Sequence, residues 1–283
     1  MAQLTLSSTI PLSSGYVMPR LGFGVYQNYT TEESCLEAFK VGYRHVDSAQ
    51  AYRNEAHVGE AVKKSGLRRE DIFLTTKCIS KYHGYEKTLK GVDESLKKFD
   101  VEYIDLFLIH NPHSGKDLRL ATYKALEECR TLGKIMSVGV SNYGVKHIEE
   151  IRQADMQLPS VNQIELHPFC QQRDIVEYCQ KHGIVVQAYC PVRFLFPRDQ
   201  DLLNELEPLL AVAGKHNKEP AQIALRWSLQ KGFAPLPKSA QPARILSNTQ
   251  VYDFVLDEAD MLKLDSMDRG KDGAISWNPV DVE

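Results

Sequence analysis

Along the chain, short runs of apolar and β-branched residues alternate with longer amphipathic segments. Some of the short runs, such as Ile-Asp-Leu-Phe-Leu-Ile at 104–109, are apolar on both faces. That pattern is typical of strands in a parallel sheet that is covered on both sides. It predicts eight strands, at residues 21–26, 43–49, 72–77, 104–110, 136–142, 161–166, 185–190 and 233–238.

The segments between these runs carry signals for helices. Apolar residues recur at spacings of three and four in 85–99, and 117–132 opens on an aspartate and is followed by glycine. The segment 173–182 also ends before a glycine, and 220–231 begins with proline and ends before glycine. Proline in the first turn and glycine after the last are typical of helix ends, so we expect helices at these positions.

Eight strands that are each followed by a helix predict a (β/α)8 barrel, the TIM-barrel architecture of the α/β class. The segments at 4–9 and around Gly15 predict a small N-terminal β-hairpin that closes the barrel floor. Two stretches break the rhythm: 192–216, with an extra helix expected at 202–213, and the tail at 265–283. We expect both to form extra loops at the rim, where barrel enzymes keep their specificity.

Composition narrows the class of protein. The 283 residues fit one barrel domain over 1–283, and the net charge of −3 with no basic block argues against a nucleic-acid partner. The chain has no apolar run of membrane-spanning length and no basic and apolar leader at its N-terminus. Six cysteines are scattered without the spacing of a disulfide framework or a metal site. We therefore expect a cytoplasmic, metal-free, monomeric protein.

Ionisable residues gather at the ends of neighbouring predicted strands. Asp47 lies near the end of the second strand, Tyr52 follows it, Lys77 ends the third and His110 ends the fourth. Each of these residues alone has an ordinary structural explanation, as a turn residue, a solvated rim cation or a structural histidine. Together they suit carbonyl reduction: tyrosine donates a proton, lysine lowers its pKa, aspartate fixes the lysine, and histidine hydrogen-bonds the carbonyl oxygen.

The candidate cofactor residues follow other strands. Gly22-Phe-Gly24 is not a full Gly-x-Gly-x-x-Gly, so a Rossmann domain is not indicated. After the last strand come polar and basic residues that suit a phosphate, which barrels commonly bind there, although a solvated basic rim is the alternative. They are Lys238, Ser239, Arg244 and Asn248, the last two four residues apart on the following helix. At other strand ends, amide and hydroxyl groups that can bind a carboxamide belong to Ser141, Asn142 and Gln163.

The sequence resembles the aldo-keto reductases over essentially its whole length. The resemblance rests on Gly-Tyr-Arg-His-Val-Asp-Ser-Ala-Gln-Ala-Tyr at 42–52, Thr-Thr-Lys at 75–77, Asp-Leu-Phe-Leu-Ile-His at 105–110, Gly-Val-Ser-Asn at 139–142, Val-Asn-Gln-Ile-Glu-Leu-His-Pro at 161–168 and Leu-Pro-Lys-Ser at 236–239. It implies that Tyr52 is the proton donor, with Asp47, Lys77 and His110 completing a tetrad, and that Asp47 also contacts the cofactor. It further implies that Tyr189 stacks on the nicotinamide, and that the basic group after the last strand binds a 2′-phosphate, which favours NADPH over NADH.

Several positions depart from the family pattern around the pocket, among them Cys190 where serine is usual. The candidates for the wall of the substrate pocket are Tyr26, Ile79, Asn111 and Trp277. We expect NADPH-dependent reduction of aldehydes or ketones to alcohols. A cofactor-sensing regulatory subunit on the same barrel and a metal-dependent hydrolase that uses Asp47 and His110 are the alternatives.

Overall fold

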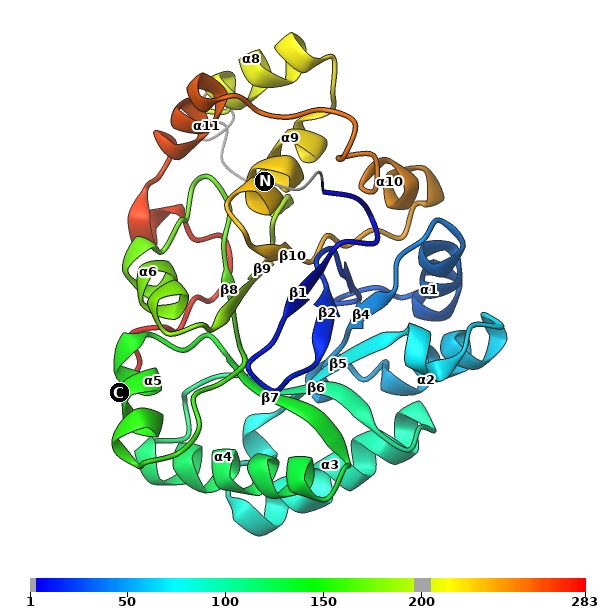
Figure 1. The fold of residues 1–283 in the computed structure, drawn as a ribbon, viewed down its shortest axis with the longest axis vertical. Helices are drawn as coiled ribbons and strands as arrows, with labels where there is room; N and C mark the ends of the chain where they lie inside the picture. Colours follow the sequence, from blue (N-terminus) through cyan, green and yellow to red (C-terminus); the bar gives the residue numbers. More distant parts are fainter. Residues whose placement is uncertain (1–3, 196–204) are drawn as a thin grey trace.

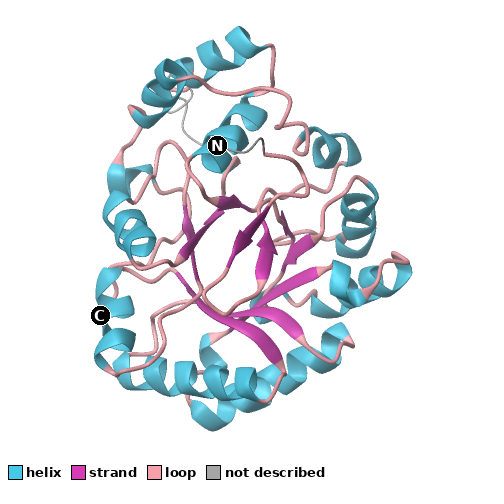
Figure 2. Cartoon of the chain, in the orientation of Figure 1, coloured by secondary structure: helices cyan, strands magenta, loops and turns pink. Residues whose placement is uncertain are grey.

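A computed structural model describes residues 4–195 and 205–283. Eight parallel strands lie side by side in the order β10-β9-β8-β7-β6-β5-β4-β3. Helices surround them on the outside (Figures 1 and 2). The strands are β3 (Phe23–Gly24), β4 (His45–Asp47), β5 (Phe73–Cys78), β6 (Ile104–Ile109), β7 (Ile135–Ser141), β8 (Val161–Glu165), β9 (Val185–Tyr189) and β10 (Ala234–Pro235). The predicted (β/α)8 barrel is confirmed.

The first and last strands close the barrel on each other. The Gly22 N–H donates to the carbonyl of Pro235 at 3.1 Å, and the Gly24 N–H donates to that of Pro237 at 3.0 Å. A Cβ atom at Gly24 would lie 3.2 Å from the carbonyl oxygen of Leu236, and a Cβ atom at Gly22 would lie 2.5 Å from Cδ2 of the same leucine. The Gly-x-Gly pair therefore lets two strands approach closely.

The helices match the segments expected from the sequence in most places. The outer layer contains α1 (Thr31–Lys40), α2 (Glu55–Lys64), α3 (Tyr85–Phe99), α4 (Lys116–Thr131), α5 (Val145–Gln153), α6 (Arg173–Lys181), α8 (Glu207–His216), α9 (Pro220–Gln230), α10 (Pro242–Ser247) and α11 (Glu258–Asp265). The extra helix expected at 202–213 is found in part, as α8. Residues 202–204 lie outside the described residues, and α8 begins later because Pro208 suits a first turn. It ends at His216, and Asn217 caps it in the left-handed conformation.

The N-terminal hairpin closes the barrel floor, but at other residues than expected. Its strands are β1 (Thr9–Pro11) and β2 (Val17–Pro19), and the segment 4–8 instead makes a turn. That turn forms because the Thr5 N–H donates to the Ser8 hydroxyl at 2.9 Å, a local bond that competes with strand pairing. Met18 from β2 is completely buried inside the barrel, where the Gln187 amide donates to its sulfur at 3.1 Å.

Candidate active site

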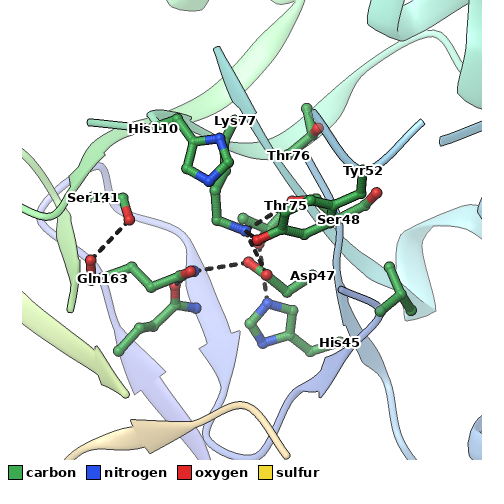
Figure 3. A network of polar contacts seen from close by, with 12 residues as sticks. His45, Asp47, Ser48, Tyr52, Thr75, Thr76, Lys77, His110, Ser141 and Gln163 are labelled. Carbon is green, nitrogen blue, oxygen red and sulfur yellow. Dashed lines mark hydrogen bonds and ion pairs between the residues drawn. The ribbon is translucent and has the colours of Figure 1, made fainter. Parts of the chain in front are cut away.

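The barrel brings the ends of three neighbouring strands to one rim. Asp47 ends β4, Lys77 lies one residue before the end of β5, and His110 directly follows β6. Tyr52 ends the short 3-10 helix η1 (Gln50–Tyr52) that follows β4. Figure 3 shows that these four side chains converge, as expected for residues at the carboxyl ends of parallel barrel strands.

Lys77 and Asp47 form a buried ion pair at the centre of the site. Lys77 Nζ lies 2.5 Å from Asp47 Oδ1, and the two side chains are 1% and 5% exposed. The ammonium also donates to the carbonyl of Ser48 at 2.8 Å and reaches the Tyr52 hydroxyl at 3.5 Å. The second carboxylate oxygen of Asp47 accepts a hydrogen bond from Gln163 Nε2 at 2.8 Å. The cation is therefore fixed in position with one donor directed at the phenol.

The acid strength of Tyr52 differs from the sequence-based expectation. Burial, and then the charge of Asp47, raise the pKa of Tyr52 well above its ordinary value. The expected net lowering of the Tyr52 pKa is therefore not found in the protein by itself, because loss of solvent dominates. Burial also lowers the pKa of Lys77, and Asp47 opposes that shift. The phenol is consequently protonated over the whole physiological range.

His110 is a neutral imidazole at the mouth of the site. Burial, followed by the charge of Lys77, lowers its pKa to about 3. Its ring stands edge-on to the Tyr52 ring, with the ring centroids 5.7 Å apart. Neither ring nitrogen makes a hydrogen bond to a residue in the described part of the chain. A neutral imidazole has one N–H, which is available here to an incoming acceptor.

The residues expected to bind the carboxamide lie at the same rim but bond to one another. Ser141 donates to the backbone carbonyl of Gln163 at 2.9 Å, and Asn142 donates to that of His110 at 3.0 Å. The Tyr189 hydroxyl donates to Asn142 Oδ1 at 2.8 Å. Gln163 donates to Gln187 at 2.9 Å as well as to Asp47, which leaves its side-chain oxygen as the group able to accept from a ligand.

The basic group after β10 is exposed in part. Lys238 is exposed and pairs with no acidic side chain in the described ranges, while partial loss of solvent lowers its pKa. Ser239 and Asn248 are buried, and Arg244 is exposed on α10. Asn248 follows the end of α10 as its cap rather than lying within the helix. An uncompensated cation beside polar groups suits an anionic ligand.

Two of the four pocket candidates contact the tetrad directly. The Tyr26 ring lies 4.9 Å from the Tyr52 ring, and the Trp277 ring lies 6.0 Å from that of His110. Both side chains are about half exposed, at 56% and 52%.

The other two candidates have bonds that shape the rim. The Ile79 N–H donates to Gln50 at 3.0 Å. Asn111 is buried and accepts from the Ser80 hydroxyl and the His113 N–H, each at 3.1 Å. Asn111 therefore stabilises the turn after β6.

Sequence reasoning missed three groups that hold the site together. The Ser48 carbonyl binds Lys77, and a backbone acceptor leaves no signal in the sequence. Gln187 supports Gln163 from inside the barrel, and its position in the apolar run of β9 was the available signal. Glu165 ends β8 with a completely buried carboxylate, at a position that the strand-end rule could have singled out.

Neither a metal-binding cluster nor a membrane-spanning helix is found in the parts of the chain that the structure covers. No group of three or more histidine, cysteine, aspartate or glutamate side chains there could hold a metal ion. No helix within 4–195 or 205–283 is long and apolar enough to cross a membrane.

Comparisons with known proteins agree with this architecture. Residues 21–269 match the model of the aldo/keto reductase family. The glyoxal reductase of Bacillus subtilis is 40% identical, with 98% of this chain and 98% of the relative covered. Morphine 6-dehydrogenase of Pseudomonas putida is 36% identical over 98% of this chain and 96% of its own. The crystal structure of a Bombyx mori aldo-keto reductase in complex with NADP has a TM-score of 0.87 and 30% identity, with 98% of both chains covered.

Proposed function

The chain belongs to the aldo/keto reductase family, as an NAD(P)H-dependent oxidoreductase, and on that premise we propose that it reduces aldehydes and ketones with NADPH and takes the proton from Tyr52. The observation that carries the proposal is the buried Lys77–Asp47 pair, which directs a fixed ammonium at the Tyr52 hydroxyl. A regulatory role would not require such a cation beside a neutral phenol and a neutral imidazole.

The residues of the site divide the work on the carbonyl oxygen. Bound NADPH supplies the hydride. His110, neutral at working pH, donates its N–H to the carbonyl oxygen and orients it. As negative charge develops on that oxygen, Tyr52 gives up its proton, because an alkoxide is a stronger base than a phenolate. Lys77 stabilises the phenolate that remains, and Asp47 keeps the ammonium charged and in place.

The choice of NADPH rests on the basic group after β10. Lys238 is a partly desolvated cation without an acidic partner in the described ranges, and Arg244 is exposed on the next helix. Both cations, with Ser239 and Asn248, would hold the 2′-phosphate of the adenosine. At the other end, the free oxygen of Gln163 and the side chains of Ser141 and Asn142 would bind the carboxamide, and Tyr189 would lie against the nicotinamide.

The relatives do not narrow the carbonyl substrate to one size. One is named for glyoxal, a small dicarbonyl, and another for morphine, a polycyclic alcohol. The half-exposed Tyr26 and Trp277 leave the mouth open, which fits tolerance of several substrate sizes. We propose an open aromatic pocket rather than a pocket built for one substrate.

We also propose that the protein acts as a single barrel domain, as a monomer in the cytoplasm. All six cysteines are free, which suits a reducing compartment. Sedimentation velocity of the purified protein tests the oligomeric state.

The first experiment titrates the protein with NADPH and with NADH and follows quenching of its tryptophan fluorescence. We expect NADPH to bind about 10- to 100-fold more tightly, the equivalent of one or two charge-assisted hydrogen bonds. Lys238→Ala should remove most of that preference, while Lys263→Ala, an exposed lysine on α11, serves as the matched control. Equal binding of NADH would contradict the phosphate assignment.

The second experiment tests the proton donor. Tyr52→Phe should abolish NADPH-dependent reduction of a panel of aldehydes and ketones while leaving NADPH affinity intact. Turnover retained in this variant would refute the mechanism. Tight NADPH binding by the unaltered protein without turnover of any carbonyl would instead favour the cofactor-sensing role.

A further inference from the structure

The last ten residues of the chain cross the mouth of the site without forming a helix or strand. Residues 274–283 follow the short 3-10 helix η5 (Gly270–Gly273). Trp277 in this tail is half exposed, yet its ring lies 6.0 Å from the ring of His110 and 5.5 Å from that of His113. An aromatic side chain on irregular backbone keeps such a place only if the backbone beside it is held.

Glu165 holds that backbone. Its carboxylate is 0% exposed and accepts hydrogen bonds from the Ile275 N–H at 2.5 Å and the Ser276 N–H at 3.0 Å, directly before Trp277. His167 Nε2 donates the third bond, at 3.1 Å. A buried carboxylate is tolerated only when its oxygens are satisfied, and two of these three donors come from the tail. The hydrogen bonds of the Glu165 carboxylate and the position of the tail therefore depend on each other.

Other contacts seat the tail on both sides of this point. A Cβ atom at Gly273 would overlap the carbonyl oxygen of Phe169, so the backbone there lies flush against the barrel. Further along, His147 Nε2 donates to the carbonyl of Val282 at 2.6 Å. The stretch that carries Trp277 lies between these two attachments, and Glu165 attaches it in the middle.

We infer that Glu165 is a positioning residue for the substrate pocket: its buried carboxylate binds the Ile275 and Ser276 N–H groups and so keeps Trp277 against His110. The inference rests on the proposed function, in which His110 receives the carbonyl oxygen. Glu165 acts on substrate through Trp277 rather than by contact with the reacting atoms. Its loss should therefore weaken substrate binding more than it slows turnover.

The test replaces the carboxylate by its amide, Glu165→Gln, which removes the charge and turns one acceptor into a donor facing backbone N–H groups. We expect KM for a carbonyl substrate to rise about tenfold, as for loss of one charge-assisted hydrogen bond. We expect kcat and NADPH affinity to stay within about threefold, because neither the tetrad nor the basic group changes. In the protein without ligand, iodide should quench Trp277 more strongly, while the buried Trp227 provides a constant background.

Two further variants separate positioning from general stability. In a Trp277→Ala background, Glu165→Gln should add little to KM, since its effect passes through that ring. Lys271→Ala removes an exposed ion pair between Lys271 and Asp281 in the same tail, and it should change neither KM nor quenching. If Glu165→Gln does not fold, Glu165→Asp provides a second test. Its shorter side chain keeps a carboxylate but places it farther from the Ile275 and Ser276 N–H groups, so we expect the same rise in KM and the same increase in iodide quenching.

Unchanged iodide quenching in Glu165→Gln, or a full KM effect that persists without Trp277, would overturn the inference. The quenching measurement needs neither cofactor nor substrate. Released Trp277 in a protein that reduces no carbonyl would therefore refute the proposed function and leave the attachment of the tail by Glu165 supported.

Discussion

Replacing Lys77 by methionine should destabilise the fold as well as stop the chemistry. The ammonium and the Asp47 carboxylate are 2.5 Å apart and almost completely buried. At an effective dielectric of about 20, their attraction is roughly 7 kcal/mol, and the desolvation of both charges offsets much of it. Removing one partner leaves a buried carboxylate without its cation, so we expect Lys77→Met to lower the free energy of unfolding by about 3–5 kcal/mol.

A second substitution tests that reasoning. In the double variant Lys77→Met with Asp47→Asn, no charge is left unpaired, and the amide oxygen still accepts from Gln163. The Ser48 carbonyl remains without its donor, which costs about 1–2 kcal/mol. The double variant should therefore be more stable than the single one, although both should be inactive.

The assay is urea unfolding at pH 7, followed by the fluorescence of the buried Trp227. A loss below about 1 kcal/mol, or a double variant as unstable as the single one, would refute the view that an uncompensated buried charge dominates.

Three more outcomes are expected. Because burial lowers the pKa of His110 to about 3, kcat/KM for reduction should not fall as the pH drops through 6.5. A fall in kcat/KM near pH 6.5 that disappears in His110→Gln would contradict a neutral histidine. Burial also lowers the pKa of His45 from 6.5 to about 4, so its contribution to stability is complete above pH 6.5 and is lost as the pH falls to about 4. The free energy of unfolding, measured by urea titration across this range, should therefore fall less steeply for His45→Gln, by about 1.4 kcal/mol per pH unit. Gly139→Ala would place a Cβ atom 2.7 Å from the carbonyl oxygen of Val161 and should lower the free energy of unfolding by about 1–3 kcal/mol. Gly214→Ala on α8 meets open space and should raise it by about 0.5–1 kcal/mol. Equal shifts in the melting temperatures of the two variants would argue against the close approach of β7 and β8.

The order and kind of the secondary-structure elements could be predicted because they depend on local patterns. Runs apolar on both faces, glycines after helices and a proline at the start of 220–231 act within a few residues of where they stand. The ends of the elements were less certain where long-range contacts decide them. The first and last strands are reduced to Phe23–Gly24 and Ala234–Pro235, where they close the barrel. The segment 4–8 prefers a local turn to strand pairing.

The sequence by itself determined the barrel family and the tetrad candidates Asp47, Tyr52, Lys77 and His110. Each of them stands at or just after a strand end, and parallel strands bring such ends to one rim. The residue types at the ends of three predicted strands are enough to make that inference.

Only the tertiary structure decided how these groups behave. The raised pKa of Tyr52 arises from burial by segments distant in the chain, so no local motif contains it. The carboxylate of Glu165 meets the Ile275 N–H across 110 residues, and that meeting sets Trp277 beside His110. Desolvation and side-chain contacts depend on which segments, distant in the sequence, pack against each other, and these contacts exist only in the folded chain.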